Sequence, residues 1–163
     1  SYYYVYGYDG TSVATAKATT NYQTYGVLYN WPAALSACPP GWHLPSDAEW
    51  KQLEMYLGIT SAQADATGWR GTAEGGKLKE EGTTHWDSPN IGATNSSGFT
   101  ALPGGYRYDD GTFYDIGNYG YWWSSTQYDT SNAWLRGLKY SGSYVFRSAN
   151  GKVRGFSVRC LRD

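Results

Sequence analysis

Side chains that bind transition metals are scarce in this 163-residue chain, which has two cysteines, Cys38 and Cys160, and two histidines, His43 and His85. Transition-metal centres are usually held by three or four histidine, cysteine or carboxylate ligands. Because the two histidines lie in separate segments, we expect no metal ligands. We expect His43, just before a predicted helix, to be a hydrogen-bonded structural residue and His85 to be an exposed loop residue.

Charge is also low, since Lys, Arg, Asp and Glu make up 17% of the residues and the net charge is −1. Nothing in this balance favours nucleic acid or an anionic membrane surface as a partner. The sequence has no apolar run of about 18 residues, the length of a membrane-spanning helix, so we expect no direct membrane insertion.

Motifs of common enzymes are missing as well. The sequence has no Gly-x-Ser-x-Gly, no phosphate-binding loop and no Gly-x-Gly-x-x-Gly before a helix. Its adjacent carboxylates, Asp109-Asp110 and Glu80-Glu81, lie in a predicted turn and in a solvated charged run. We therefore expect no enzymatic activity and keep a degenerate or unknown enzyme only as a third alternative.

Aromatic residues and glycine are abundant instead, with 17 Tyr, 8 Trp and 21 Gly. Tyrosine supplies rigid, amphipathic contact area to binding surfaces at low entropic cost. The alternative explanation is a β-rich domain in which tyrosine is frequent because it favours strands. Both explanations stay open from composition alone.

The helical signals lie in the first half of the chain. Ser46 and Glu49 form a capping box, and an apolar stripe follows until Gly58 ends the predicted helix. Shorter helices are predicted over residues 27–37, with Pro32 in the first turn, and over residues 61–66. Residues 1–25 are predicted to form an N-terminal strand and arm, in which residues 2–8 are a strand and residues 13–24 are irregular.

Short strands and turns dominate the second half. Strands are predicted over residues 99–102, 121–125, 133–140, 144–147 and 155–163. Turns are predicted at 109–111, 141–142 and 150–151. Helices early and antiparallel strands late predict an α+β fold, and the length predicts one domain over residues 1–163.

The two cysteines are 122 positions apart, and Cys160 lies in the last predicted strand. A disulfide between them would join the beginning of the fold to its end and would indicate an oxidising compartment. Two free buried thiols are the alternative.

Several sequence blocks follow one another in a specific order along nearly the whole chain. They are Tyr25-Gly26-Val27-Leu28-Tyr29-Asn30-Trp31, Cys38-Pro39-Pro40-Gly41-Trp42-His43-Leu44-Pro45-Ser46, Trp50, Gly76-Lys77-Leu78-Lys79, Trp86, Gly98-Phe99, Leu102-Pro103-Gly104-Gly105-Tyr106-Arg107, Tyr121-Trp122-Trp123-Ser124-Ser125-Thr126, Ala133-Trp134 and the last nine residues. This order resembles the Fibrobacter succinogenes major paralogous domain, a family of the Bacteroidetes–Fibrobacteres group. That family is similar in turn to the formylglycine-generating-enzyme branch of the C-type-lectin-like fold, whose Arg-Leu-Pro-Thr-x-x-Glu-Trp motif corresponds to residues 43–50.

The resemblance implies a C-type-lectin-like fold, in which two main helices flank small twisted antiparallel sheets with many long loops. It implies that Cys38, at the end of the first helix, pairs with Cys160 in the last strand. It also implies an extracellular or outer-membrane-surface location, with a lipid anchor through a segment upstream of Ser1 as a further option. The start at Ser1 is itself typical of a trimmed mature chain. The catalytic relatives use a cysteine pair that holds copper or three histidine ligands, and this chain has neither set.

Calcium is the cofactor alternative that remains, because it binds loop oxygens. Lectins of this fold hold calcium through a Glu/Gln-Pro-Asn/Asp loop and a Trp-Asn-Asp strand, which residues 86–90 and 131–134 match poorly. We therefore expect no cofactor and keep a structural calcium or sodium ion as an option. Its candidate ligands are Asp87, Asn90, Asn95, Asp129 and Asn132.

Our functional expectation is a monomeric, non-catalytic surface module that binds a glycan or a protein through its C-terminal strands and loops. The alternative is a structural or interaction domain of a larger surface lipoprotein or fimbrial assembly. Trp134 and Leu138 are expected to face the core. The residues expected to be displayed for the ligand are Tyr114, Tyr119, Tyr128, Arg136, Lys139, Tyr140, Ser143, Tyr144, Arg147 and Asn150.

Overall fold

The computed structural model describes residues 1–163 as a mixed α/β fold with six helices, small sheets and one disulfide. The helices are α1 (Val13–Lys17), α2 (Thr20–Tyr25), α3 (Trp31–Ala34), α4 (Asp47–Leu57), α5 (Ser61–Asp65) and α6 (Glu74–Leu78). The strands are β1 (Tyr3–Tyr4), β2 (Leu28–Tyr29), β3 (Trp42–His43), β4 (Gly68–Arg70), β5 (Gly104–Arg107), β6 (Phe113–Ile116), β7 (Tyr119–Gln127), β8 (Asn132–Lys139), β9 (Val145–Gly151) and β10 (Leu161–Arg162).

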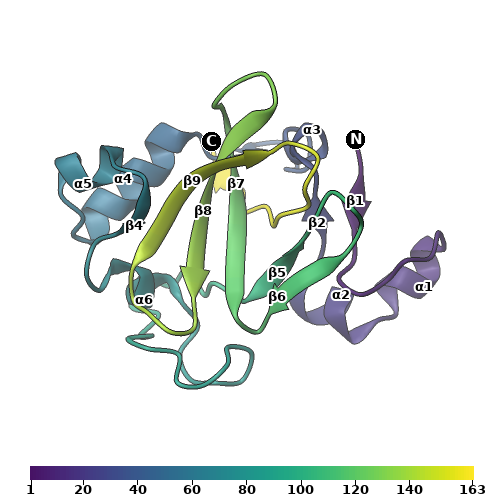
Figure 1. The fold of residues 1–163 in the computed structure, drawn as a ribbon, viewed down its shortest axis with the longest axis horizontal. Helices are drawn as coiled ribbons and strands as arrows, with labels where there is room; N and C mark the ends of the chain where they lie inside the picture. The colour runs from purple at the N-terminus through teal and green to yellow at the C-terminus, as the bar shows by residue number, and fades with distance from the viewer.

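A six-stranded sheet with the order β4-β9-β8-β7-β5-β6 forms the centre of the molecule. Its pairs are antiparallel except β5 and β7, which are parallel. Helices α4, α5 and α6 lie on one side of this sheet in Figure 1, and the N-terminal arm with α1 and α2 lies on the other. Two small sheets, β1-β2 and β10-β3, attach the two ends of the chain to its first third.

The longest helix, α4, forms as its sequence predicts. The Ser46 hydroxyl accepts a hydrogen bond from the Glu49 backbone, and the Glu49 carboxylate accepts one from the Ser46 backbone. These bonds satisfy amide groups that lack partners in the first turn. Gly58 has a φ of 126° at the other end, a conformation that L side chains rarely adopt, and the helix stops there.

Two hydrophobic cores hold the sheet. The first lies between the sheet and helices α4–α6 and contains Trp50, Trp86, Trp122, Leu138 and Val145. The second lies against the other face, where it joins α3 to the C-terminal segment through Ala34, Leu44, Trp123, Leu135 and Phe156. Because the second core covers only part of that face, the rest of it stays open.

The Cys38–Cys160 disulfide is present, with a Cα–Cα distance of 5.7 Å across 122 positions. It joins the segment after α3 to the segment before β10, as the resemblance implied. No cysteine is free. Both chain ends lie in the upper part of the view in Figure 1.

Several predictions in the N-terminal third are wrong. Residues 13–24 are not irregular, because the Ser12 and Thr19 hydroxyls cap two short helices, α1 and α2. Neither helix buries a residue, so no apolar stripe announced them. Strand β1 has only two residues, and the predicted helix over residues 27–37 shortens to α3 because Leu28–Tyr29 pairs with β1.

The C-terminal half also differs in detail. Residues 150–151 continue β9 opposite β8, and the chain turns after them. The predicted strand over residues 155–163 makes only isolated bridges until β10, because it crosses from one sheet to another. Residues 99–102 contribute one bridge, between Lys79 and Ala101. The turns at 109–111 and 141–142 are confirmed.

Candidate functional site

Alternation along β8 and β9 decides which side chains are accessible, because successive residues point to opposite faces of a sheet. Arg136, in β8, and Arg147, in β9, are register partners on the face covered by the helices. Gly137 and Phe146 are partners on the other face. The predicted binding segment is therefore split between a buried face and an open one.

Arg136 and Arg147 are buried, with 1% and 5% of their surfaces exposed, so the expectation that they are displayed is wrong. Arg136 donates to Asp47 at 2.8 Å and to Glu54 at 2.5 Å. Arg147 donates to Asp47 at 2.9 and 2.8 Å, and Arg70 binds Glu54 at 2.8 and 3.0 Å. Three arginines and two acids thus form one buried network between α4 and the sheet.

Burial alone would raise the pKa of Asp47, but hydrogen bonds from Arg147 and Arg136 outweigh it and hold that pKa well below its usual range. Asp47 is therefore ionised at neutral pH, as a carboxylate facing two guanidinium groups must be. This network is structural, since every one of its charges has a partner inside the protein.

The open face of the sheet presents a continuous line of rings, which we call the aromatic row. Register places Tyr121, Gly137, Phe146 and Trp69 side by side across β7, β8, β9 and β4. The row consists of Trp69, Phe146, Tyr119, Tyr121, Tyr106 and Tyr114. Its ring centroids are separated by 4.9 Å (Trp69–Phe146), 6.4 Å (Trp69–Tyr119), 5.7 Å (Tyr119–Tyr121), 5.6 Å (Tyr106–Tyr121) and 5.5 Å (Tyr106–Tyr114).

Gly137 allows one ring of the row to lie flat on the sheet. A Cβ atom there would come within 2.9 Å of the Tyr121 ring and 3.3 Å of the Phe146 Cβ. The Tyr119 and Tyr121 rings are nearly parallel, at 4°. Tyr106 and Tyr121 also contact Phe156 of the second core, so the row is fixed from beneath.

Polar groups flank the row at both ends. The Lys139 ammonium lies 4.4 Å from the Trp69 ring centroid, a cation–π distance. At the other end, the half-buried Asp115 carboxylate accepts no hydrogen bond from the protein, and burial raises its pKa. Burial also raises the pKa of Tyr121, with a further contribution from the nearby Asp115 charge. An unpaired carboxylate beside neutral phenols is free to accept hydrogen bonds from a ligand.

The structure brings together three of the predicted binding residues, Tyr114, Tyr119 and Lys139. Tyr128 is 57% exposed but lies elsewhere, packed on Trp134 with 4.8 Å between the ring centroids. Trp134, expected in the core, is only half-buried and lies 3.7 Å beneath the Arg147 guanidinium, whereas Leu138 is buried as expected.

The other predicted residues are separate from the row or engaged elsewhere. Tyr140 packs against the first core, and the Ser143 hydroxyl donates to the Thr72 carbonyl at 2.6 Å. Asn150 binds the backbone of Gly151 at 2.9 Å, and Tyr144 is 43% exposed in the β8–β9 loop.

Sequence reasoning missed four of the six residues of the aromatic row as binding residues: Trp69, Phe146, Tyr106 and Tyr121. Trp69 was overlooked because β4 has three residues and no strand was predicted there. Phe146 could have been identified, because side chains alternate along a strand and its neighbours Val145 and Arg147 point to the buried face.

The two histidines are both engaged. His43 Nδ1 lies 2.6 Å from an Asp163 carboxylate oxygen and Nε2 lies 2.9 Å from Glu49, which confirms a hydrogen-bonded structural role. His85 lies in a loop, as expected, but it is half-buried against Tyr25 and binds Glu80 at 2.8 Å, so the expectation that it is exposed is wrong.

No group of three or more His, Cys, Asp or Glu side chains comes together as a metal site. Among the calcium candidates, the Asp129 carboxylate instead accepts hydrogen bonds from the backbone of Ser131 and from Asn132. Asn90 donates to the carbonyls of Glu80 and Gly82.

Comparison with known proteins gives one match. The family described as Fibrobacter succinogenes major domain matches residues 4–162, which confirms the resemblance to that family. No curated protein and no solved structure matches the chain. None of the helices in the structure has the length and apolar character needed to cross a bilayer.

Proposed function

We propose that this chain, which belongs to the Fibrobacter succinogenes major domain family, is a non-catalytic surface module that binds a glycan across its aromatic row. The observation that supports this most directly is a line of six rings on the open part of the sheet, in which each ring lies beside the next. Trp69 and Tyr114, at opposite ends of the row, are 38% and 41% exposed.

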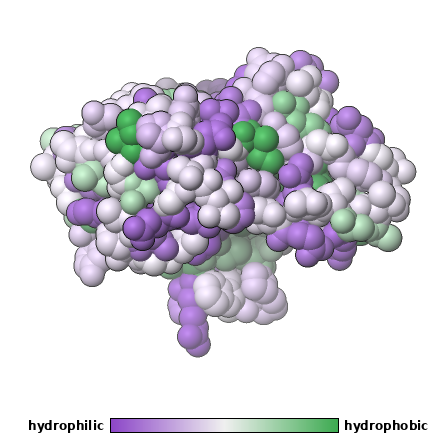
Figure 2. Space-filling view, turned by 90° about the horizontal axis from the view of Figure 1, so that it is seen from below, coloured by the Kyte–Doolittle hydropathy of each residue, from purple (hydrophilic) through white to green (hydrophobic).

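The chemistry of the row suits a sugar chain. Ring faces pack against the apolar C–H surfaces of sugars, and the phenol hydroxyls, Lys139 and Asp115 supply donors and acceptors for sugar hydroxyls. The rings are already held by β pairing and by Phe156, so binding would cost little conformational entropy. In Figure 2, strongly hydrophobic residues form only small separate areas, which does not favour a broad aliphatic interface on the side shown.

A binding role is preferred to catalysis because only one carboxylate lies beside the aromatic row. Glycoside hydrolysis generally needs two carboxylates on opposite sides of the scissile bond. Asp115 is the single acid beside the row, and the row itself contains no histidine or cysteine. The proposal therefore assigns recognition to this surface and no chemical step.

The proposal extends to the finer fold and the location. The disulfide between the first third and the end of the chain, together with the capping-box helix, supports a C-type-lectin-like fold. A structural disulfide also supports an extracellular or outer-membrane-surface location, because disulfides persist in oxidising compartments. We expect the isolated module to be monomeric.

The test is a glycan-array screen followed by titration of the best ligand with two matched tyrosine variants. Tyr114→Ala removes an exposed ring from the row, whereas Tyr56→Ala removes a ring that is 88% exposed on α4. Loss of binding in the first variant alone supports the proposal. Equal affinity of both variants and the parent, or no glycan bound at all, contradicts it.

A second candidate function is an interaction domain within a larger assembly. The observation that favours it is a hollow of about 670 Å³ within the N-terminal arm, between the β1 segment and α1. Its lining includes Tyr2, Tyr3 and Val13. These three residues are 66%, 63% and 55% exposed. If this candidate is correct, Tyr3→Ser will weaken assembly with neighbouring protein in a crosslinking assay and leave glycan binding unchanged.

A further inference from the structure

Asp115 combines two unfavourable features at one position beside the aromatic row. Its backbone φ is 66°, in the left-handed region that L side chains rarely adopt. Its half-buried carboxylate accepts no hydrogen bond from the protein, and burial alone raises its pKa. Strained backbone and unpaired charge persist mainly where a site needs them, so the residue points to a ligand that supplies the missing partner.

The other non-glycine residues in the left-handed region have compensating hydrogen bonds. The Asn90 amide donates to two backbone carbonyls. Asn95 and Thr100 bond to each other, through the Asn95 amide group and the backbone and hydroxyl of Thr100. The Asp115 side chain makes no such bond, so its conformation gains nothing from the rest of the fold.

The Asp115 carboxylate is within reach of a ligand. Side-chain atoms that are closed to solvent and lack a hydrogen-bond partner occur on Trp50, Arg70 and Asn90. Both Asp115 oxygens also lack a partner, but neither belongs to that closed group. A donor that arrives from solvent can therefore contact them.

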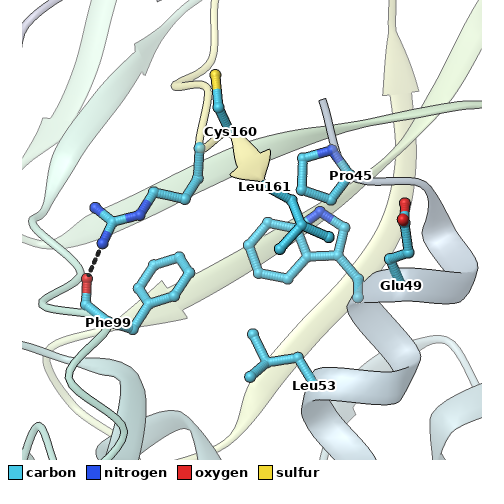
Figure 3. Close-up of a pocket in the computed structure, with 8 residues that line it drawn as sticks. Pro45, Glu49, Leu53, Phe99, Cys160 and Leu161 are labelled. Carbon is cyan, nitrogen blue, oxygen red and sulfur yellow. Dashed lines mark hydrogen bonds between the residues drawn. The ribbon is translucent and has the colours of Figure 1, made fainter. Parts of the chain in front are cut away.

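The pocket beside the disulfide shows the opposite situation. It has a volume of about 270 Å³ and lies between α4, the loop at Phe99 and the chain leading into β10, as Figure 3 shows. Arg159 donates to the Phe99 carbonyl at 2.7 Å, and the Glu49 carboxylate accepts from the Ser46 backbone at 2.7 Å. The charged groups of that pocket already have partners in the protein, whereas Asp115 has none.

Cations of the chain itself lie on ring faces at both ends of the aromatic row. The Lys139 ammonium is 4.4 Å from the Trp69 ring centroid. The Arg154 guanidinium is 4.1 Å from the ring centroid of Tyr108, which packs on Tyr114. These distances are those of cation–π contacts, so ring faces on this surface attract positive charge.

The negative charge of Asp115 has no such counterpart. It contributes to the raised pKa of Tyr106 and of Tyr121, so the carboxylate lies near both phenols. None of the cation–π contacts in the structure involves either ring. Arg154 influences the pKa of Tyr106 but not that of Asp115. A carboxylate and two aromatic rings therefore lie together without a cation.

We propose that the glycan bound by the aromatic row contains an amino sugar, whose ammonium group donates to the Asp115 carboxylate and lies against the Tyr106 and Tyr121 rings. This inference rests on the proposed function and names the class of glycan. An ammonium group is favoured over a sugar hydroxyl because a hydrogen bond between two charged groups is the stronger one. Rings arranged in a line suit a chain of sugars, whereas an isolated ammonium ligand is typically held in a cage of rings.

The test compares two pentasaccharides that differ at the second carbon of each sugar. The β-linked glucosamine pentamer has an ammonium group there, and cellopentaose has a hydroxyl. Each is titrated calorimetrically into the whole chain at about pH 6, where amino groups are protonated. We expect the glucosamine pentamer to bind about tenfold more tightly.

The possible failures of the two proposals differ. Equal affinity for the two pentasaccharides, with both lost in Tyr114→Ala, overturns the amino sugar and leaves the glycan proposal standing. No binding of the glucosamine pentamer up to about 10 mM also overturns the amino sugar, and the glycan array then decides the proposed function separately.

Variants assign the preference to one carboxylate. Asp115→Asn keeps the size of the side chain, and asparagine tolerates a positive φ. This variant should bind the glucosamine pentamer about tenfold more weakly than the parent and cellopentaose within about twofold of the parent. Asp109→Asn is the matched control, because it removes an exposed carboxylate from the β5–β6 turn, and it should change neither affinity. Equal losses in the two variants overturn the assignment of Asp115.

Thermal unfolding separates a binding role from a structural one. The Asp115 carboxylate makes no hydrogen bond in the protein, so Asp115→Asn should unfold at the same temperature as the parent or at a higher one. A clearly lower unfolding temperature would show that the fold needs the carboxylate and would overturn the proposal. Asp115→Gly, which also suits a positive φ, replaces the asparagine variant if that variant does not fold.

Discussion

Arg147 holds both oxygens of the Asp47 carboxylate, through Nε at 2.9 Å and Nη2 at 2.8 Å, although 100 positions separate the two residues. This fork fixes the first turn of α4 to strand β9. Arg136 adds a third bond to the same carboxylate, from the adjacent strand. The orientation of the helix on the sheet therefore depends on one buried charge cluster as well as on the apolar core.

Asp47→Asn should destabilise the fold by about 3–5 kcal/mol, because it leaves the buried Arg147 guanidinium without a counter-ion and removes one of the two carboxylates that Arg136 binds. Urea unfolding would measure the loss. Asp65→Asn is the matched control, since the Asp65 carboxylate also forms an ion pair, with Lys51 at 2.7 Å, but its side chain is 71% exposed. The control should change stability by less than about 1 kcal/mol. Similar losses in both variants would contradict the central role of the buried cluster.

The same cluster predicts acid sensitivity. The pKa of Asp47 is lowered in the folded state, so its stabilising contribution is complete above its unfolded pKa of about 3.9. That contribution is lost progressively as the pH falls below this value towards the folded pKa. Between pH 5 and pH 2, the midpoint temperature of thermal unfolding should therefore fall more steeply for the parent than for Asp47→Asn.

His43 should titrate above its ordinary pKa of about 6.5, because hydrogen bonds to Asp163 and Glu49 favour the imidazolium. A raised folded pKa adds stability that is complete below the unfolded pKa and disappears as the pH rises through the folded pKa. NMR titration of the His43 ring would measure the value. Asp163→Asn should lower it, and an unchanged pKa in that variant would show that the C-terminal contact is absent in solution.

Removing the disulfide by a Cys38→Ala, Cys160→Ala double change should cost about 2–5 kcal/mol, because the unfolded chain gains freedom across 122 positions. Thermal unfolding with and without reductant would measure the difference. The parent should lose stability on reduction and the double variant should not respond. A parent that is equally stable in both states would exclude the bond as a source of stability.

Gly137→Ala should displace the Tyr121 ring, since the new Cβ would lie 2.9 Å from that ring. The variant should therefore bind any ligand of the aromatic row more weakly. We expect a stability loss of about 1–3 kcal/mol from the overpacked contact. Gly151→Ala is the control in the same sheet, because its Cβ would meet only Val153 at 3.9 Å. If both variants bind alike, Tyr121 does not depend on the glycine.

Helix α4 could be predicted to the residue because its signals are local: a capping box, an apolar stripe and a terminal glycine lie within 13 positions. The membership of the aromatic row could not, because it depends on register between strands that are up to 77 positions apart, as for Trp69 and Phe146. Arg136 and Arg147 were misplaced for the same reason. An arginine flanked by apolar residues is compatible with either face until its acidic partners, here Asp47 and Glu54, are known.

The disulfide also divides the chain into two mechanical parts. Residues 38–160 form a covalent ring that contains α4 and the whole central sheet. A protease that cuts once in any loop of this ring leaves the two fragments joined, so the cut protein would keep its mass until the disulfide is reduced. Residues 1–37 lie outside the ring, and no covalent bond other than the peptide chain joins them to it. The Tyr29–Phe156 bridge and the hydrogen bond from the Trp31 indole to the Ser124 carbonyl are among the contacts that hold them, so residues 1–37 are a segment that one cut can release.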